Sequence, residues 1–169
     1  MNGLAEIRQK NTPYAHGICL ALYRYVEMFP GLEVPMVQRV LVVEDNDDWR
    51  AIMALFLTRM GYKVVQATDG VEAVEKAVSE LPDLILMDHK LPKLSGLQAT
   101  AQIKENPATM DIPVVLCTAF GPEAYKDDPI LNSLAEVVQK PIRLDMFQAL
   151  VQKYLPASSA IGTVEPQPV

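Results

Sequence analysis

The stretch that decides the fold is Arg39-Val40-Leu41-Val42-Val43-Glu44-Asp45-Asn46, in which an apolar run ends in two acids. Apolar residues without strict alternation are typical of a strand that is buried on both faces of a parallel sheet. Four more short apolar runs follow along the chain, at residues 63–67, 83–87, 113–117 and 134–138. Segments with helical spacing lie between these runs. The alternation predicts an α/β fold with a doubly wound, five-stranded parallel sheet and helices on both faces.

Apolar spacing and end signals predict where the helices lie. One apolar face is expected on the helix after the first strand, made by Trp49, Ile52, Met53, Phe56, Leu57 and Met60. Asn46 or Asp47 is expected to cap that helix, and Gly61 to end it. The next helix is expected to open with a capping box of Asp69 and Glu72. Its buried stripe is predicted to comprise Val71, Val74, Val78 and Leu81.

The length of 169 residues corresponds to one domain with short segments on either side. The domain is predicted to span residues 36–155. Residues 156–169, rich in Pro, Ser and Ala, are predicted to form a disordered tail. Residues 1–35 form an N-terminal extension with two interpretations: one apolar helix over residues 14–29, or an artefact of a mis-assigned start, with translation beginning at Met36. No output domain is expected after Leu155.

Composition disfavours several classes of function. The net charge of −6 argues against broad nucleic-acid binding, so no direct nucleic-acid partner is expected. No apolar run reaches the ~18 residues of a transmembrane helix, so no membrane association is expected. Cys19 and Cys117 lie far apart, as is typical of buried, reduced thiols in a cytoplasmic protein. No glycine-rich phosphate loop follows the first strand, which disfavours a dinucleotide or flavin site.

Polar side chains stand at the ends of four of the five predicted strands. A flavodoxin-like strand order, 2-1-3-4-5, would make the first and third strands neighbours. Ligands of such sheets bind outside the carboxyl ends of the strands. The order is expected to bring together Glu44, Asp45, Asp88, Thr118 and Lys140. The second strand, at the sheet edge, contributes nothing to this point.

These residue types suit phosphoryl chemistry. Three carboxylates packed together repel one another unless a cation joins them, and a few oxygen ligands suit Mg²⁺. Lys140 could pair with a carboxylate at rest and with a phosphoryl oxygen after reaction, and the Thr118 hydroxyl could donate to another. Asp88, on the central strand, is the best candidate nucleophile. Each residue alone has a simpler interpretation: a solvated helix-capping loop for Glu44 and Asp45, and ordinary turn or loop positions for Thr118 and Lys140.

Four motifs resemble the receiver domain of two-component response regulators. They are Val42-Val43-Glu44-Asp45-Asn46, Leu84-Ile85-Leu86-Met87-Asp88 running on to Pro92 and Gly96, Thr118-Ala119, and Lys140-Pro141. The resemblance covers residues 39–155. It implies a stand-alone cytoplasmic receiver that accepts a phosphoryl group on Asp88 from a sensor histidine kinase or a histidine phosphotransfer protein. Because such a domain catalyses its own phosphorylation and slow dephosphorylation, it is not a conventional enzyme.

The resemblance also implies roles for the site residues. Mg²⁺ would be bound by Asp45, Asp88 and the backbone carbonyl of Lys90, while Glu44 would act on the metal mainly through water. Thr118 and Lys140 would hold the phosphoryl oxygens, and the bond before Pro141 would be cis. An unknown downstream protein would bind the face made by the fourth helix, the fifth strand and the fifth helix.

One region and three single positions depart from the usual receiver pattern or tune it. Val137 stands where receivers usually carry an aromatic residue that reports phosphorylation. The fourth helical region, residues 121–133, contains two prolines and is predicted to be short or irregular. Lys90 and Phe120 occupy the positions that tune phosphoryl lifetime, and a cation with a bulky ring there predicts a long-lived phosphoryl group.

Two other functions compete with a phosphorylatable receiver. Val137 and the irregular fourth helical region motivate a phosphate-independent interaction module that keeps the receiver fold. A phosphatase with an Asp nucleophile would need a second Asp two residues later as general acid, and Lys90 stands there instead.

Overall fold

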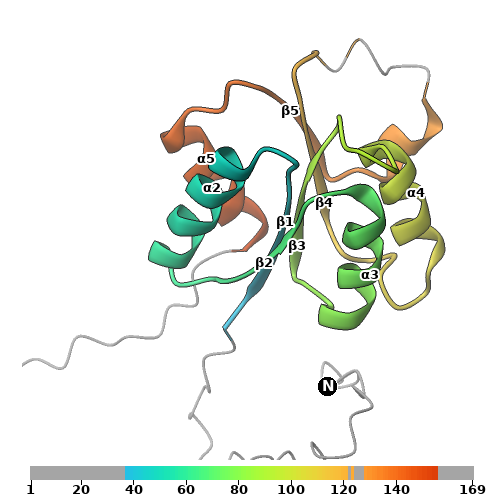
Figure 1. Ribbon diagram of the computed structural model, residues 1–169, viewed down its shortest axis with the longest axis horizontal. Coiled ribbons are helices and arrows are strands. Elements are labelled where there is room, and N and C mark those ends of the chain that lie inside the picture. The colour runs from blue at the N-terminus through green and yellow to red at the C-terminus, as the bar shows by residue number, and fades with distance from the viewer. Residues whose placement is uncertain (1–36, 122, 124–127, 156–169) are drawn as a thin grey trace, which may run out of the picture. The chain divides into compact units, whose positions relative to one another are not determined.

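The computed structural model describes residues 37–121, 123 and 128–155, in which a parallel sheet lies between two layers of helices (Figure 1). The strands are β1 Arg39–Val43, β2 Lys63–Ala67, β3 Leu84–Asp88, β4 Val114–Thr118 and β5 Glu136–Gln139. The helices are α2 Asp47–Arg59, α3 Gly70–Glu80, α4 Gly96–Glu105 and α5 Leu144–Tyr154, with a 3₁₀ helix, η2, over Pro129–Ser133. The predictions for residues 1–35 and 156–169 concern residues outside the described part.

The five strands lie in the order β2-β1-β3-β4-β5, and every neighbouring pair is parallel. The predicted flavodoxin-like order is therefore confirmed. Val43 is paired with Ala67 on one side and Met87 on the other, so β1 and β2 end level and β3 runs one residue further, to Asp88. Asp88 is paired with Cys117 of β4. The strand order reverses between β1 and β3, which is where ligands bind in folds of this kind.

The unbroken apolar run of β1 has a simple cause, because its side chains point alternately into two separate cores. Val40 and Val42 pack on the side covered by α2 and α5. Leu41 and Val43 pack on the opposite side, covered by α3 and α4. Figure 1 shows the two helix pairs on either side of the sheet. Because both faces of β1 are buried, polar side chains occur only at the ends of this strand.

The buried face of α3 differs from the prediction. Val71 and Val78 are 41% and 43% exposed, whereas Ala73 and Ala77 are fully buried. α3 packs against both the sheet and α4, and the short alanine side chains let these elements approach closely. Valine spacing identified the helix correctly and its buried face only in part. Val74 packs partly buried against the core, whereas Val71 and Val78 are exposed, because the space available decides which side chains are enclosed.

The helix ends follow the predicted signals with one correction. The Asn46 side chain caps α2, and Gly61 follows α2 with a φ of +92°. The Asp69 side chain caps α3. The predicted capping box with Asp69 is wrong in its second half, because the Glu72 carboxylate accepts from the Thr68 backbone N–H at 2.7 Å. Glu72 therefore ties the end of β2 to α3 rather than closing on the cap residue.

Two further predictions concern the bounds of the strands and the fourth helical region. β3, β4 and β5 begin one or two residues later than predicted, and each also ends one residue later. Asp88 and Thr118 are therefore the last residues of β3 and β4. In the fourth helical region, Pro129–Ser133 form a 3₁₀ helix capped by Asp128. The prediction of a short, irregular helix holds for these described residues, whereas Pro122 and Asp127 lie outside them.

Replacing Ala77 by Leu should lower the free energy of unfolding by about 1–3 kcal/mol, because this fully buried position has no room for extra methylenes. Val78→Ala, at the neighbouring half-exposed position, should change it by about 0.5 kcal/mol or less. Urea unfolding followed by circular dichroism measures both values. A larger loss for Val78→Ala than for Ala77→Leu would contradict the observed orientation of α3.

Candidate functional site

The structure brings together the five side chains that the strand-end argument selected. Glu44 and Asp45 follow β1, Asp88 and Thr118 end β3 and β4, and Lys140 follows β5. Because β1 and β3 are neighbours, carboxylate oxygens of Glu44, Asp45 and Asp88 all lie within 4.8 Å of one another. The edge of the sheet therefore holds a compact acidic cluster.

The Lys140 ammonium lies between two of these acids. Its Nζ is 2.6 Å from Oε2 of Glu44 and 2.6 Å from Oδ1 of Asp88. Glu44 is 3% exposed and Asp88 is 7% exposed, so both carboxylates are almost removed from water. Buried carboxylates are tolerated when a cation and hydrogen bonds compensate them, and Lys140 is that cation here.

Burial and charge act in opposite directions on the two partners. Burial raises the pKa of Glu44, and the nearby Lys140 only partly offsets this effect. For Lys140, burial lowers the pKa, but its bonds to Asp88 and Glu44 outweigh burial and raise it overall. The lysine is therefore held in its charged form, so it remains available as a cation for any anion that replaces a carboxylate.

Both oxygens of the Asp88 carboxylate have partners. Oδ1 faces Lys140, while Oδ2 accepts from the backbone N–H of Lys90 at 3.1 Å. These contacts hold the carboxylate at a defined orientation beside the acids that follow β1. The predicted role of the Lys90 backbone carbonyl remains a prediction.

Thr118 is fully buried at the end of β4. Its Oγ1 accepts from the backbone N–H of Phe120 at 3.1 Å, and its carbonyl accepts from the N–H of Lys140 at 2.7 Å. The second bond places the threonine beside the lysine. The Lys140–Pro141 peptide bond is cis, as the resemblance implied.

A glycine holds the segment after Asp88 in place. A Cβ atom at Gly96 would lie 2.1 Å from the backbone carbonyl oxygen of Asp88, which no side chain could accommodate without a shift. The Gly96 N–H also donates to the carbonyl of His89 at 3.0 Å. The start of α4 therefore rests directly on the backbone of the candidate nucleophile.

A second set of contacts fixes the same segment from α3. The Lys93 ammonium is 2.5 Å from Oδ2 of Asp69, the residue that caps α3. A Cβ atom at Gly70 would lie 2.1 Å from the carbonyl oxygen of Leu94. Sequence reasoning used Asp69 only as a helix cap and missed this link, because the ion pair joins residues on separate elements.

Arg50 is another residue that sequence reasoning missed. Its Nη1 donates to the backbone carbonyl of Glu44 at 2.8 Å, and its guanidinium also pairs with Asp47. The arginine on the first turn of α2 therefore fixes the loop that carries the first two acids. The only available signal was a basic residue among the acids at positions 44–48.

The donor set fits a hard divalent cation. Three carboxylates and one ammonium leave a formal charge of −2 on the four side chains, which a divalent cation would balance. Mg²⁺ prefers oxygen ligands and commonly takes one or two carboxylates together with phosphate oxygens. Asp45 is exposed, so one side of the cluster is open to solvent.

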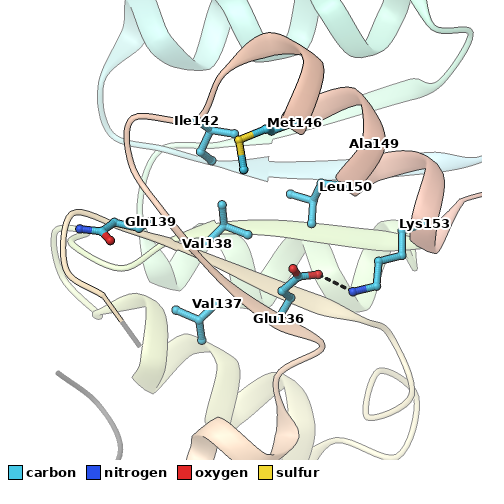
Figure 2. Close-up of a pocket in the computed structure, with 9 residues that line it drawn as sticks. All are labelled: Glu136, Val137, Val138, Gln139, Ile142, Met146, Ala149, Leu150 and Lys153. Carbon is cyan, nitrogen blue, oxygen red and sulfur yellow. Dashed lines mark hydrogen bonds and ion pairs between the residues drawn. The ribbon is translucent and has the colours of Figure 1, made fainter. Parts of the chain in front are cut away.

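The face expected for partner proteins contains a groove of about 530 Å³ between β5 and α5. Figure 2 shows Val138 and Leu150 on its two sides, with Ile142 and Met146 above them. Glu136 and Lys153 form an ion pair of 2.8 Å at one end. Val137, in the place of the usual aromatic residue, packs partly buried on the other side of the sheet.

The fold and the site together define a class of protein: a flavodoxin-like domain with an acidic cluster and a lysine at its strand switch point. Residues 40–152 match the family model of the response regulator receiver domain. The chain is 32% identical over 120 residues to the polar-differentiation response regulator DivK of Brucella ovis, an alignment that covers 71% of this chain and 98% of DivK. The chain therefore belongs to the response regulator receiver domain family.

Solved structures are similar as well. One is the receiver domain of the sensor histidine kinase PA1611 from Pseudomonas aeruginosa, which holds a magnesium ion in its active-site cleft. It is 29% identical, has a TM-score of 0.64, and the match covers 71% of this chain and 98% of that chain. Another is the response regulator TrrA from Thermotoga maritima in complex with Mg²⁺ and BeF. It is 30% identical, with a TM-score of 0.63 and coverage of 70% and 99%.

Helices capable of crossing a bilayer are absent from the residues that the structure describes, since each is too short or too polar.

Gly96→Ala should disturb the site and lower the free energy of unfolding by about 1–3 kcal/mol, because the new methyl group would meet the Asp88 carbonyl. Gly61→Ala is the control: it places Ala at a φ of +92° but meets no atom within 4 Å, so it costs about 1 kcal/mol of backbone strain only. Urea unfolding gives the stabilities, and two-dimensional NMR shows whether the Asp88 and Lys140 amide signals move. Unmoved signals at Asp88 in Gly96→Ala would contradict the proposed packing.

Proposed function

We propose that this receiver accepts a phosphoryl group on Asp88 from a phosphohistidine of a sensor histidine kinase or a phosphotransfer protein, with Mg²⁺ as cofactor. The observation that carries the proposal is the contact of Lys140 with both Glu44 and Asp88 at 2.6 Å, beside a third carboxylate. A nucleophilic carboxylate, a cation and a cluster of oxygen ligands are what in-line transfer to an aspartate requires.

Each residue has a defined part in the proposed reaction. A carboxylate oxygen of Asp88 forms a bond to phosphorus while the bond from phosphorus to the donor nitrogen breaks. Asp45, Asp88 and the Lys90 carbonyl would hold Mg²⁺, with Glu44 acting mainly through water. When bound, the metal neutralises charge on the phosphoryl oxygens.

Lys140 and Thr118 would hold the transferred group. Before the reaction, Lys140 is occupied by Glu44 and Asp88, and the transferred phosphoryl group offers its ammonium new oxygen partners. The buried Thr118 carries a hydroxyl that can donate to a further phosphoryl oxygen. Such a domain promotes its own phosphorylation and slow hydrolysis rather than turning over a separate substrate.

The proposal includes where the protein works and what it contacts. We infer a cytoplasmic location, consistent with the free, buried Cys117. The downstream partner would be a protein that binds the face containing η2, β5 and α5, where the groove of Figure 2 lies. No direct contact with nucleic acid is proposed.

A second candidate function is a phosphate-independent interaction module with the receiver fold. Val137 favours it, because the aromatic residue that usually reports phosphorylation is missing. The short η2 helix favours it as well, because the usual output face is altered there. The two functions differ in whether Asp88 reacts with a phosphodonor.

Incubation with acetyl phosphate and Mg²⁺ should add one phosphoryl group to the protein, because the proposal makes Asp88 the nucleophile that accepts it. Intact-mass measurement detects the addition. Asp88→Asn and chelation with EDTA should each abolish it, since they remove the nucleophile and the metal. A protein that gains no phosphoryl group, or an Asp88→Asn variant that still gains one, would refute the proposal. The phosphate-independent interaction module would then be the remaining candidate function.

Phe120→Glu should shorten the half-life of the phosphorylated form by a few-fold. The Phe120 ring, two residues after Thr118, would be replaced by a carboxylate that can assist the attacking water. Loss of the phosphoryl group over time by intact mass gives the half-life. Met110→Glu, an exposed apolar residue outside the site, is the matched control and should keep the wild-type half-life. Equal half-lives for Phe120→Glu and wild type would contradict the prediction that Phe120 prolongs the lifetime of the phosphoryl group.

A further inference from the structure

A second hollow adjoins the acidic cluster. It measures about 510 Å³ and is lined by Glu44, Asn46, Trp49, Lys140 and Pro141, and it is called the Trp49 pocket below. The volume lies within the range of about 300–1,000 Å³ typical of ligand pockets. Glu44 and Lys140 also belong to the charge cluster, and Lys140 contacts Asp88 directly. A group in this pocket would therefore lie beside the candidate nucleophile.

The remaining walls of the pocket are two ring-bearing residues and a capping side chain. The Asn46 side chain accepts from the backbone N–H of Trp49 at 2.9 Å, which fixes Trp49 on the first turn of α2. The indole is partly buried and packs against the core between α2 and α5. Pro141 is exposed. The pocket thus combines flat apolar surface with charged groups from the site.

Trp49 carries a polar atom that the fold leaves unsatisfied. Its Nε1 is buried and is the one such side-chain atom without a hydrogen-bond partner among residues 37–121, 123 and 128–155. A buried donor without a partner costs free energy, and native proteins rarely keep one without a reason. The unpartnered N–H gives no advantage for core packing, so the feature that the pocket offers a ligand is the aromatic ring of Trp49 itself.

We propose that the Trp49 pocket receives the heteroaromatic ring of an N-phosphorylated imidazole, so that Trp49 selects phosphodonors that carry such a ring. The inference rests on the proposed function and adds the contact that recognises the leaving group. Asp88 bonds to phosphorus as the P–N bond breaks, and the electron pair of that bond stays on the ring nitrogen. The reacting form of the donor is protonated on its other ring nitrogen, so the ring leaves as neutral imidazole with that proton.

Three small phosphodonors test the proposal on the full chain with Mg²⁺. Phosphoimidazole has a P–N bond and a ring, phosphoramidate has a P–N bond without a ring, and acetyl phosphate has neither. Intact mass gives the rate for each donor. Aromatic pairs contribute enough to change rates by about two- to tenfold, so Trp49→Leu should lower the ratio of phosphoimidazole to phosphoramidate rates by that factor.

Two control variants separate ring recognition from structural damage. Trp49→Phe keeps an aromatic ring and should retain most of the ratio, whereas Leu55→Ala, exposed on α2 and outside the pocket, should keep the wild-type ratio. A ratio in Trp49→Leu equal to that of wild type would overturn the inference, even if all three rates fall together. A wild-type protein that reacts with none of the donors would instead overturn the proposed function on which the inference rests.

Discussion

The contact of the Lys140 ammonium with Glu44 and Asp88, 2.6 Å from each, is the interaction on which the site depends. Two nearly buried carboxylates so close together would repel each other or take up a proton without a cation between them. The cation arrives from the end of β5 and the acids from the ends of β1 and β3. The strand order is therefore tied to the charge balance, because it makes β1 and β3 neighbours and so sets their two acids within reach of one lysine.

Around this contact, the backbone is held by close approach rather than by large side chains. Gly96 rests on the Asp88 carbonyl and Gly70 on the Leu94 carbonyl, each at a distance that excludes a Cβ atom. The Asp69–Lys93 ion pair ties the same segment to α3. Rigid support of this kind keeps the Asp88 carboxylate oriented while the side of the cluster at Asp45 stays open to solvent.

Sequence patterns predicted well where a local rule decides the outcome. Buried strands read as unbroken apolar runs, and Asn46 and Gly61 act within their own helix ends. Prediction was wrong for two valines of α3, because Ala73 and Ala77 are enclosed by α4 and the sheet while Val71 and Val78 are exposed. Glu72 was misassigned for a similar reason: its carboxylate accepts from the backbone N–H of Thr68 rather than from that of the cap residue Asp69.

The sequence by itself determined the alternation of strands and helices and the five polar residues at the strand ends, because these follow from local apolar runs. The strand order was an expectation taken from the flavodoxin-like fold class, which the structure confirmed. The tertiary structure alone decided which atoms meet: that Lys140 reaches both Glu44 and Asp88, that Arg50 holds the Glu44 backbone, and that a pocket with Trp49 lies beside them. These contacts join residues up to 96 positions apart. Their distances are set by packing between elements, which no local pattern along the chain encodes.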